Sequence, residues 1–239
     1  MKLIYRFFIF QFAVVFAVSL LLLFPIFYFF LKIEVNYPIV FKLKRLWARF
    51  LFLGFFSRIE VEGKEHIPEN DSFIICPNHS SYLDIIAMYL VIDKLFIFMA
   101  KSELSQWPLF GIFFKTMDIS VNRKSPINAA KAFIRAKREL DAGRNVVLFP
   151  EGTIPKDNPK LIPFKDGAFK MAFDSNKAIL PITFTNNYGI IGALYGEKLR
   201  VAPGKTKAII SAPLYPSDFD DCKALKDATF AQIQHNLPS

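Results

Sequence analysis

One long hydrophobic run lies near the start of the chain. From Phe7 to Leu31 there is no charged residue, and only Gln11 and Ser19 interrupt the apolar character. A helix over these residues would extend about 37 Å, whereas the hydrocarbon core of a bilayer is about 30 Å thick. Because the run has no polar face and no small-residue cleavage site follows it, it predicts a membrane-inserted helix rather than a core helix or a signal peptide. Pro25 can kink this helix or let it turn back within one leaflet.

A second helical stretch, Ile39 to Phe56, combines basic and apolar positions. Lys42, Arg45 and Arg49 share one face of the predicted helix, and the other positions are rich in phenylalanine and leucine. We interpret the pattern as a helix at the membrane interface, and the alternative is an amphipathic helix packed on the globular part. Basic residues are more numerous after the first run than before it, which predicts a cytoplasmic location for the rest of the chain. Residues 1–57 are therefore expected to form a two-helix membrane anchor.

From residue 58 to residue 239, apolar runs alternate with stretches of helical periodicity. The predicted strands are Ser72–Cys76, Leu95–Ala100, Ile119–Val121, Val146–Phe149, Ile179–Phe184 and Ala208–Ser211. The predicted helices are Asp84–Ile92, Ser102–Phe114, Asn128–Leu140 and Asp166–Asp174. This alternation is typical of the α/β class and predicts one domain with a mixed, largely buried sheet flanked by helices. The proline-rich segment Pro150–Pro163 follows a predicted strand, so we expect a loop at a sheet edge, where α/β proteins place their chemistry.

Composition supports lipid contact and leaves the partner open. The 239 residues are enough for one globular domain with an appendage; 53% of them are hydrophobic and 28 are phenylalanine. A formal net charge of +9 is compatible with nucleic acid, anionic lipid headgroups or an acidic protein as partner. Cys76 and Cys222 lie far apart in the sequence, so neither a disulfide framework nor a zinc-binding spacing is present.

The candidate chemistry begins after the first predicted strand of the domain. His79 and Asp84 are separated by a turn that leads into a predicted helix. Histidine takes up a proton near neutral pH, and a carboxylate bonded to its second nitrogen fixes the tautomer and stabilises the imidazolium. The spacing can bring the two side chains together as a general base and its orienting partner. The alternative is that Asp84 caps the helix and that His79 is an ordinary turn residue.

Several short motifs follow one another in a fixed order. They are Asn78-His79-x-x-x-x-Asp84, Lys101 with Glu103-Leu104 and Pro108-x-x-Gly111, the segment ending at Arg123, Phe149-Pro150-Glu151-Gly152-Thr153, Phe164-Lys165-x-Gly167-Ala168-Phe169, and Leu180-Pro181. Together they cover about Ile59 to Pro181. In this order they resemble the glycerolipid acyltransferase family, most closely its 1-acylglycerol-3-phosphate acyltransferases.

The resemblance implies direct attack of an acceptor hydroxyl on an acyl thioester, with His79 removing the hydroxyl proton and no covalent acyl-enzyme. It implies acyl-CoA or acyl carrier protein as the donor substrate, a lysophospholipid as acceptor, and neither a cofactor nor a metal. The sequence has no G-x-S-x-G motif, which agrees with direct transfer. The substrate-binding residues expected on this basis are Asn78, Lys101, Arg123, Glu151, Gly152, Thr153 and Lys165.

The acceptor phosphate is where the chain departs from the family pattern. Arg123 matches a family arginine associated with the phosphate, but Ile154 stands where a second arginine is expected. Either the phosphate site is built differently, or the acceptor is another lysolipid, for example an ornithine lipid. Lys101 and Lys165 can supply charge or be solvated loop residues. Glu151 can line the site, followed by amides able to bond a phosphate or an oxyanion, or it can pair with a neighbouring lysine.

A membrane-anchored nucleic-acid-binding module is the competing class of function. Such a module needs basic residues interleaved with exposed aromatics, whereas the aromatics here are concentrated in the predicted membrane segment. Donor, acceptor and membrane surface are all anionic, so the basic charge is explained without nucleic acid. The sequence therefore predicts a membrane-bound enzyme with membrane lipids as partners and its active site on the cytoplasmic face.

Overall fold

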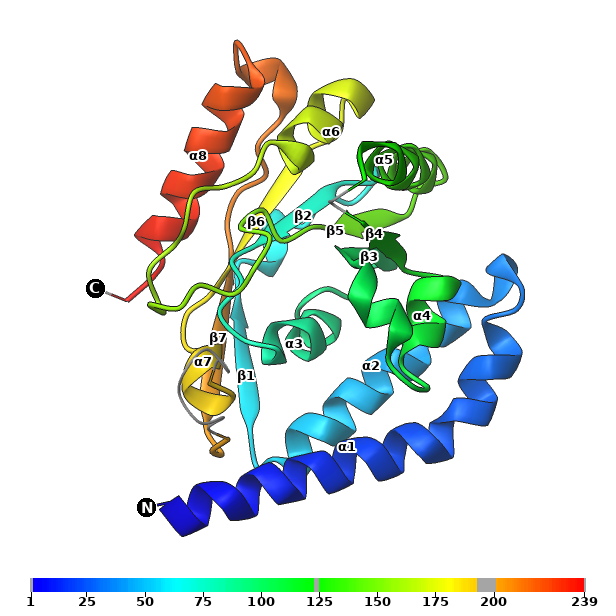
Figure 1. Ribbon diagram of the computed structural model, residues 1–239. Helices are drawn as coiled ribbons and strands as arrows, with labels where there is room; N and C mark the ends of the chain where they lie inside the picture. The colour runs from blue at the N-terminus through cyan, green and yellow to red at the C-terminus, as the bar shows by residue number, and fades with distance from the viewer. Residues whose placement is uncertain (1, 123–124, 193–200, 239) are drawn as a thin grey trace.

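The computed structural model describes residues 2–122, 125–192 and 201–238. Within these residues a seven-stranded sheet lies between two groups of helices (Figure 1). The strands are β1 (Arg58–Glu62), β2 (Ile74–Pro77), β3 (Phe96–Lys101), β4 (Ile119–Val121), β5 (Asn145–Val147), β6 (Ile179–Phe184) and β7 (Lys205–Ile210). Their order is β1-β7-β6-β2-β5-β3-β4, with β6 and β7 antiparallel and the other neighbours parallel. The predicted mixed sheet flanked by helices is confirmed.

The helices cover both faces of this sheet. They are α1 (Lys2–Phe30), α2 (Tyr37–Gly54), α3 (Leu83–Val91), α4 (Gly111–Lys115), α5 (Pro126–Asp141), α6 (Gly167–Ser175), α7 (Asn187–Ile190) and α8 (Cys222–His235). Short 3₁₀ turns stand at Glu34–Asn36, Lys64–His66, Ser102–Gln106 and Pro216–Asp218. In Figure 1, α5, α6 and α8 lie on one side of the sheet, α2, α3 and α4 lie on the other, and α1 lies outside α2.

Some elements differ from the sequence prediction, among them the short helix α7, which was not predicted. The expected helix Ser102–Phe114 is divided into a 3₁₀ turn and α4, because Pro108 between them has no backbone N–H to donate. Strand β1 was not predicted, because its alternation of charged and apolar residues reflects an edge position with a half-exposed face. The C-terminal helix α8 was also missed, since its apolar positions are too sparse to stand out.

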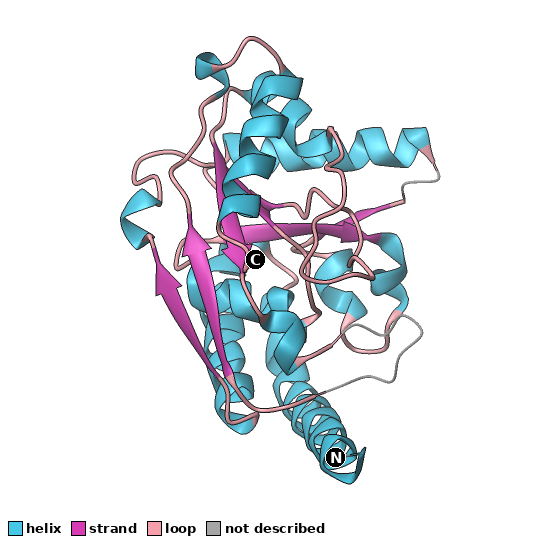
Figure 2. Cartoon of the chain, turned by 90° about the vertical axis from the view of Figure 1, so that its left-hand side faces the viewer, coloured by secondary structure: helices cyan, strands magenta, loops and turns pink. Residues whose placement is uncertain are grey.

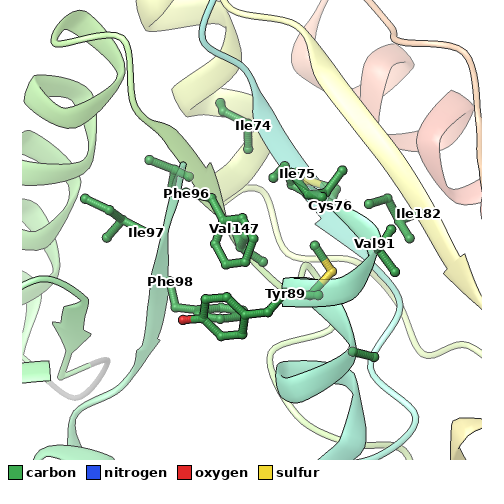
Figure 3. Packing of buried hydrophobic residues seen from close by; sticks show 14 of the residues in the cluster. Ile74, Ile75, Cys76, Tyr89, Val91, Phe96, Ile97, Phe98, Val147 and Ile182 are labelled. Atoms are coloured by element: carbon green, nitrogen blue, oxygen red, sulfur yellow. The ribbon is translucent and has the colours of Figure 1, made fainter. Parts of the chain in front are cut away.

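The core is formed where the central strands meet α3. Ile74, Ile75 and Cys76 of β2 are fully buried, and so is Val147 of β5. Figure 3 shows these side chains packed with those of β3 and with Tyr89 from α3. Because both faces of the central strands are covered, their sequences are nearly continuous apolar runs. The carboxyl ends of the parallel strands β2 and β5 therefore reach the same edge of the sheet, and the chain segments that follow them meet there.

Helix α1 packs along α2 through its few polar residues and through aromatic side chains such as Phe16, which contacts Trp47. Gln11 Nε2 donates a hydrogen bond of 2.9 Å to the carbonyl of Gly54, and Trp47 Nε1 donates one of 2.8 Å to Ser19 Oγ. In the described chain, the stretch Tyr5–Phe30 is the one helix long and apolar enough to cross a membrane. Figure 2 shows α1 running away from the sheet, with the N-terminus at its outer end. Its exposed apolar side chains include Phe7, Phe10, Val14, Val18, Leu21, Leu22, Ile26 and Phe29.

Helix α2 has an inner face that belongs to the core of the following domain. Phe41, an apolar residue of the predicted interfacial helix, is buried against Tyr89 and Phe96 of the globular part. Trp47 is buried against Phe16 and Phe27 of α1. Lys44 is buried as well, and its Nζ lies 2.9 Å from Asp118 Oδ2. The alternative interpretation, packing on the domain, therefore describes this face. The opposite face exposes Ile39, Lys42, Leu46, Arg49, Phe50 and Leu53.

Candidate active site

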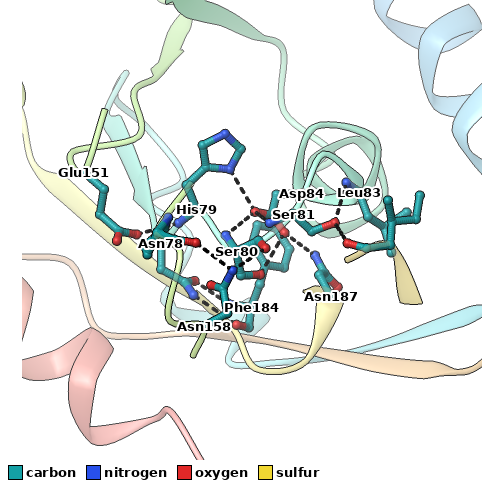
Figure 4. A network of polar contacts seen from close by, with 12 residues as sticks. Asn78, His79, Ser80, Ser81, Leu83, Asp84, Glu151, Asn158, Phe184 and Asn187 are labelled. Atoms are coloured by element: carbon teal, nitrogen blue, oxygen red, sulfur yellow. Dashed lines mark hydrogen bonds and ion pairs between the residues drawn. The ribbon is translucent and has the colours of Figure 1, made fainter. Parts of the chain in front are cut away.

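The turn between β2 and α3 brings His79 and Asp84 together. His79 Nδ1 lies 3.0 Å from Asp84 Oδ2 (Figure 4). Asp84 is 0% exposed, whereas 14% of the His79 side chain remains exposed. An ionised carboxylate can only accept hydrogen bonds, so Nδ1 carries the proton and Nε2 keeps its lone pair. The ring of His79 also stacks on Phe149, with centroids 4.1 Å apart, which fixes its plane.

Asp84 is held by a dense set of donors. Its Oδ2 accepts hydrogen bonds of 2.7 Å and 2.9 Å from the backbone N–H groups of Ser80 and Ser81, in addition to that from His79. Its Oδ1 accepts one of 2.6 Å from Asn187 Nδ2. The carboxylate also stands in the first turn of α3, where the helix dipole favours negative charge. The orientation of Asp84 is therefore set by the fold rather than by His79 alone.

Glu151 reaches the same turn from the segment after β5. Its Oε1 accepts a hydrogen bond of 2.7 Å from the backbone N–H of His79, and its Oε2 accepts one of 3.2 Å from that of Ile162. Its side chain is buried, with the whole residue 1% exposed. Burial raises the pKa of Glu151 to about 7, the two backbone hydrogen bonds oppose this shift, and the charge of Asp84 adds to it. Glu151 therefore holds the backbone of His79, and its predicted substrate contact stays a prediction.

The loop after Glu151 is fastened over the catalytic turn. Asn158 Nδ2 donates a hydrogen bond of 3.2 Å to the carbonyl of Ser80. Gly152 adopts a φ of 73°, a conformation suited to glycine, and its N–H donates to the carbonyl of Phe149 at 3.1 Å. The Gly152 amide thus closes its own turn, and the expected phosphate or oxyanion contact of this segment stays a prediction. Ile154, at the position of the expected second arginine, is only 6% exposed.

Of the other predicted substrate-binding residues, one is buried in the framework of the site and the rest that the structure describes are exposed at the surface. Asn78 Nδ2 donates to the carbonyl of Phe184 at 3.0 Å, and the N–H of Phe184 donates back to Asn78 Oδ1 at 2.7 Å. The buried Asn78 amide thus joins the turn after β2 to β6, and its predicted substrate contact stays a prediction. Lys101 is exposed at the end of β3, and its Nζ lies 2.9 Å from Glu103 Oε1. Thr153 and Lys165 are exposed.

Arg123 lies outside the described residues, so its predicted role stays a prediction. Two side chains of the network around Asp84 were missed by sequence reasoning: Asn187, and Thr206, whose hydroxyl donates to Asn187 Oδ1. Phe149 was recognised as part of a motif, but its contact with the His79 ring was not predicted. A usable signal existed for Asn187, because it follows the predicted strand Ile179–Phe184, and polar residues at strand ends gather at one sheet edge.

Neighbouring hydroxyls and thiols are arranged unfavourably for nucleophilic catalysis. The Ser80 and Ser81 hydroxyls are buried, and they donate to Asp84 Oδ1 at 3.3 Å and to the carbonyl of Ile191 at 2.6 Å. Burial raises the pKa of the Cys76 thiol, which disfavours the reactive thiolate. The arrangement therefore offers a general base, His79 Nε2, that can accept a proton from a bound hydroxyl.

Comparisons with known proteins give one consistent result. A family model described as Acyltransferase matches residues 58–185. The chain is 34% identical to a 1-acyl-sn-glycerol-3-phosphate acyltransferase of Borreliella burgdorferi over 60% of this chain and 58% of that protein. It is 30% identical to the 1-acyl-sn-glycerol-3-phosphate acyltransferase alpha of Mus musculus over 83% of this chain and 67% of that protein.

A solved structure is similar over nearly the whole chain. The crystal structure of the 1-acyl-sn-glycerophosphate (LPA) acyltransferase PlsC from Thermotoga maritima has a TM-score of 0.83 and 25% identity. The match covers 98% of this chain and 95% of that one, α1 and α2 included. The chain spans about half the length of several curated relatives that it matches.

Proposed function

The chain belongs to the acyltransferase family, and from this premise we propose that it transfers a fatty acyl group from an acyl thioester to the free hydroxyl of a 1-acylglycerol-3-phosphate, forming phosphatidate. The observation that carries the proposal is the buried Asp84 carboxylate bonded to Nδ1 of a partly exposed His79. The names of the relatives support the choice of acceptor, since the Borreliella and Mus proteins both carry that activity in their names.

His79 acts as general base in the proposed reaction. Its Nε2 takes the proton of the acceptor hydroxyl as the hydroxyl oxygen attacks the thioester carbonyl carbon. Asp84 stabilises the imidazolium that forms. When the tetrahedral intermediate collapses, the carbon–sulfur bond breaks and His79 returns the proton to the leaving thiolate. The buried hydroxyls of Ser80 and Ser81 favour this direct transfer over an acyl-serine intermediate.

The donor is proposed as an acyl thioester of coenzyme A or of acyl carrier protein, with no further cofactor. Both donors are anionic and suit a chain of formal net charge +9. We propose Arg123 as the main partner of the acceptor phosphate, on the basis of the resemblance alone. Glu151 and Asn78 are assigned to the framework of the site, because backbone groups occupy their carboxylate and amide.

We propose that α1 and α2 contact the membrane together. Gln11 and Ser19 bond α1 to α2, which packs on the domain, and Phe27 contacts Phe113, so α1 is attached from residue 11 to residue 27. The outer face of α2 mixes apolar side chains such as Phe50 with Lys42 and Arg49, a pattern typical of an interfacial helix. Both helices then lie on or within one leaflet, and the basic flanks favour the cytoplasmic one.

One observation supports a second class of acceptor. Ile154 is buried where the family pattern has an arginine, so this position offers no charge to a phosphate. A lysolipid without a phosphomonoester, for example an ornithine lipid, would need no such charge. The reaction and the role of His79 would be the same.

One experiment tests both the reaction and the acceptor. Purified protein in detergent is incubated with radiolabelled palmitoyl-CoA or palmitoyl-acyl carrier protein and a panel of lysolipids, and the products are separated by thin-layer chromatography. Labelled phosphatidate from 1-acylglycerol-3-phosphate is expected. Labelling of another lysolipid alone would move the assignment to the second acceptor class, and no acyl transfer to any acceptor would contradict the proposed function.

A further inference from the structure

Asp84 has a second partner on the side away from His79. Asn187 Nδ2 donates a hydrogen bond of 2.6 Å to Asp84 Oδ1, while His79 bonds Oδ2. Figure 4 shows Asn187 and the His79 ring on opposite sides of the carboxylate. Asn187 opens the short helix α7, which follows β6, so it reaches the catalytic turn from a distant part of the chain.

Thr206 holds the other end of the Asn187 amide. Because an ionised carboxylate can only accept hydrogen bonds, the NH₂ end of Asn187 faces Asp84 and Oδ1 faces away from it. The Thr206 hydroxyl in β7 donates a hydrogen bond to this Oδ1 and so holds the amide in place. Both side chains are buried, so water does not readily replace either partner.

We propose that Asn187 is a positioning residue for acyl transfer, oriented by Thr206 and acting on His79 through Asp84. The Thr206 hydroxyl donates to Asn187, and Asn187 donates to Asp84. The same carboxylate accepts the hydrogen bond from His79 Nδ1 on its other oxygen. Loss of the Asn187 amide leaves Oδ1 of a buried carboxylate with a weaker partner, the Ser80 hydroxyl at 3.3 Å. The carboxylate is then held mainly through Oδ2, by the N–H groups of Ser80 and Ser81 and by His79, so its tilt relative to the imidazole is less restricted.

A purely structural role for this segment can be separated from a role through Asp84. The adjacent Asn186 ties the same connection to β7, because its Nδ2 donates to the carbonyl of Lys205 at 2.8 Å and its Oδ1 accepts from the N–H of Lys207 at 3.3 Å. Both of these bonds end on β7 rather than on Asp84. Asn186→Ala is therefore a matched control that removes a comparable tether.

The kinetic test compares Asn187→Ala, Thr206→Val, Thr206→Ser and Asn186→Ala, with 1-acylglycerol-3-phosphate and palmitoyl-CoA as substrates; this arm rests on the proposed function. Asn187→Ala and Thr206→Val should lower kcat about tenfold with KM changed less than about twofold, and Thr206→Ser should recover most of kcat. Asn187→Ala should cause little further loss when Asp84 is already alanine. An equal loss in Asn186→Ala, or a full additional loss in the Asp84→Ala background, would overturn the proposal.

A second measurement needs no substrate. The proton on His79 Nδ1 is followed by NMR and assigned by its absence in His79→Ala. Its resonance should shift or broaden in Asn187→Ala and Thr206→Val and stay in place in Asn186→Ala. A shifted signal in a protein with no acyl transfer would defeat the proposed function and leave the positioning role intact. An unmoved signal in folded Asn187→Ala would contradict the positioning role itself.

Discussion

The backbone N–H of His79 donates a hydrogen bond of 2.7 Å to Oε1 of Glu151, a residue that follows a different strand. Glu151 thus joins the two main motifs of the chain at the base of the histidine. Its other oxygen accepts from the N–H of Ile162, so the same carboxyl also fastens the loop that crosses the site. A glutamate in this motif therefore serves the histidine by fixing its backbone.

The burial of Glu151 predicts a pH-dependent stability. Burial raises its pKa from 4.5 to about 7, so the folded state binds this proton more tightly than the unfolded state does. The contribution is fully present below the unfolded pKa and is lost as the pH rises through about 7. Relative to Glu151→Gln, the wild-type free energy of unfolding should fall by up to about 3 kcal/mol across this window. Urea unfolding of both proteins at a series of pH values measures this; a constant difference would contradict it.

Lys44 is expected to be far more important for stability than its neighbour Lys42. Its ammonium is buried against Asp118, whose other oxygen accepts a hydrogen bond of 3.0 Å from the N–H of Phe98. Lys44→Ala leaves that carboxylate buried without its charge partner, which should cost about 3–5 kcal/mol. Lys42→Ala, on the exposed face of α2, should change the free energy of unfolding by less than about 0.5 kcal/mol. Denaturant unfolding of both variants decides between these values, and equal effects would show that the buried pair is unimportant.

The two N-terminal helices should respond differently to deletion. The interface between α2 and the domain includes Phe41 and Leu51, so removing residues 1–57 uncovers apolar core and should abolish cooperative unfolding. Removing residues 1–31 keeps α2 but uncovers Trp47 and Phe113, which Phe27 contacts, so this shorter protein should stay folded with a lower free energy of unfolding and bind lipid vesicles less. Circular dichroism and vesicle sedimentation measure the two properties. A soluble, cooperatively folding protein that begins at residue 58 would instead support the simple division into anchor and domain.

Ile154→Arg should not create the missing phosphate contact. Ile154 is buried, so an arginine there must either bury its charge or distort the loop. We expect a loss of at least about 2 kcal/mol in the free energy of unfolding and no decrease in KM for 1-acylglycerol-3-phosphate. Ile154→Val, which keeps the site apolar, should cost about 1 kcal/mol. A stable Ile154→Arg variant with a lower KM would show that the position faces the acceptor.

Local sequence patterns predicted much of the fold, because strands that are buried on both faces have nearly continuous apolar sequences. The bounds of β4 and β6 agree with the apolar runs Ile119–Val121 and Ile179–Phe184, and α5 covers the predicted helix Asn128–Leu140. The turn from His79 into α3 was also readable, since its two residues are close in sequence. Edge strand β1 was not, because half of its residues face solvent.

The parts that escaped prediction depend on contacts between distant residues. Lys44 looked like one more basic residue of an amphipathic helix, and only the position of Asp118 in space explains its burial. Asn187 and Asp84 are 103 residues apart, so no local pattern links them. Glu151 was recognised from its motif, but the role of its carboxyl depends on where the His79 backbone lies.

The role of His79 as the base is tested most directly by turnover of His79→Ala. Purified wild-type and variant proteins are compared with a labelled acyl thioester and 1-acylglycerol-3-phosphate, and circular dichroism serves as the control for folding. The variant should be slower by about 100-fold or more, and His79→Ala combined with Asp84→Ala should be scarcely slower than His79→Ala alone, because the pair acts as one unit. Near-wild-type turnover by a folded His79→Ala protein would contradict the mechanism.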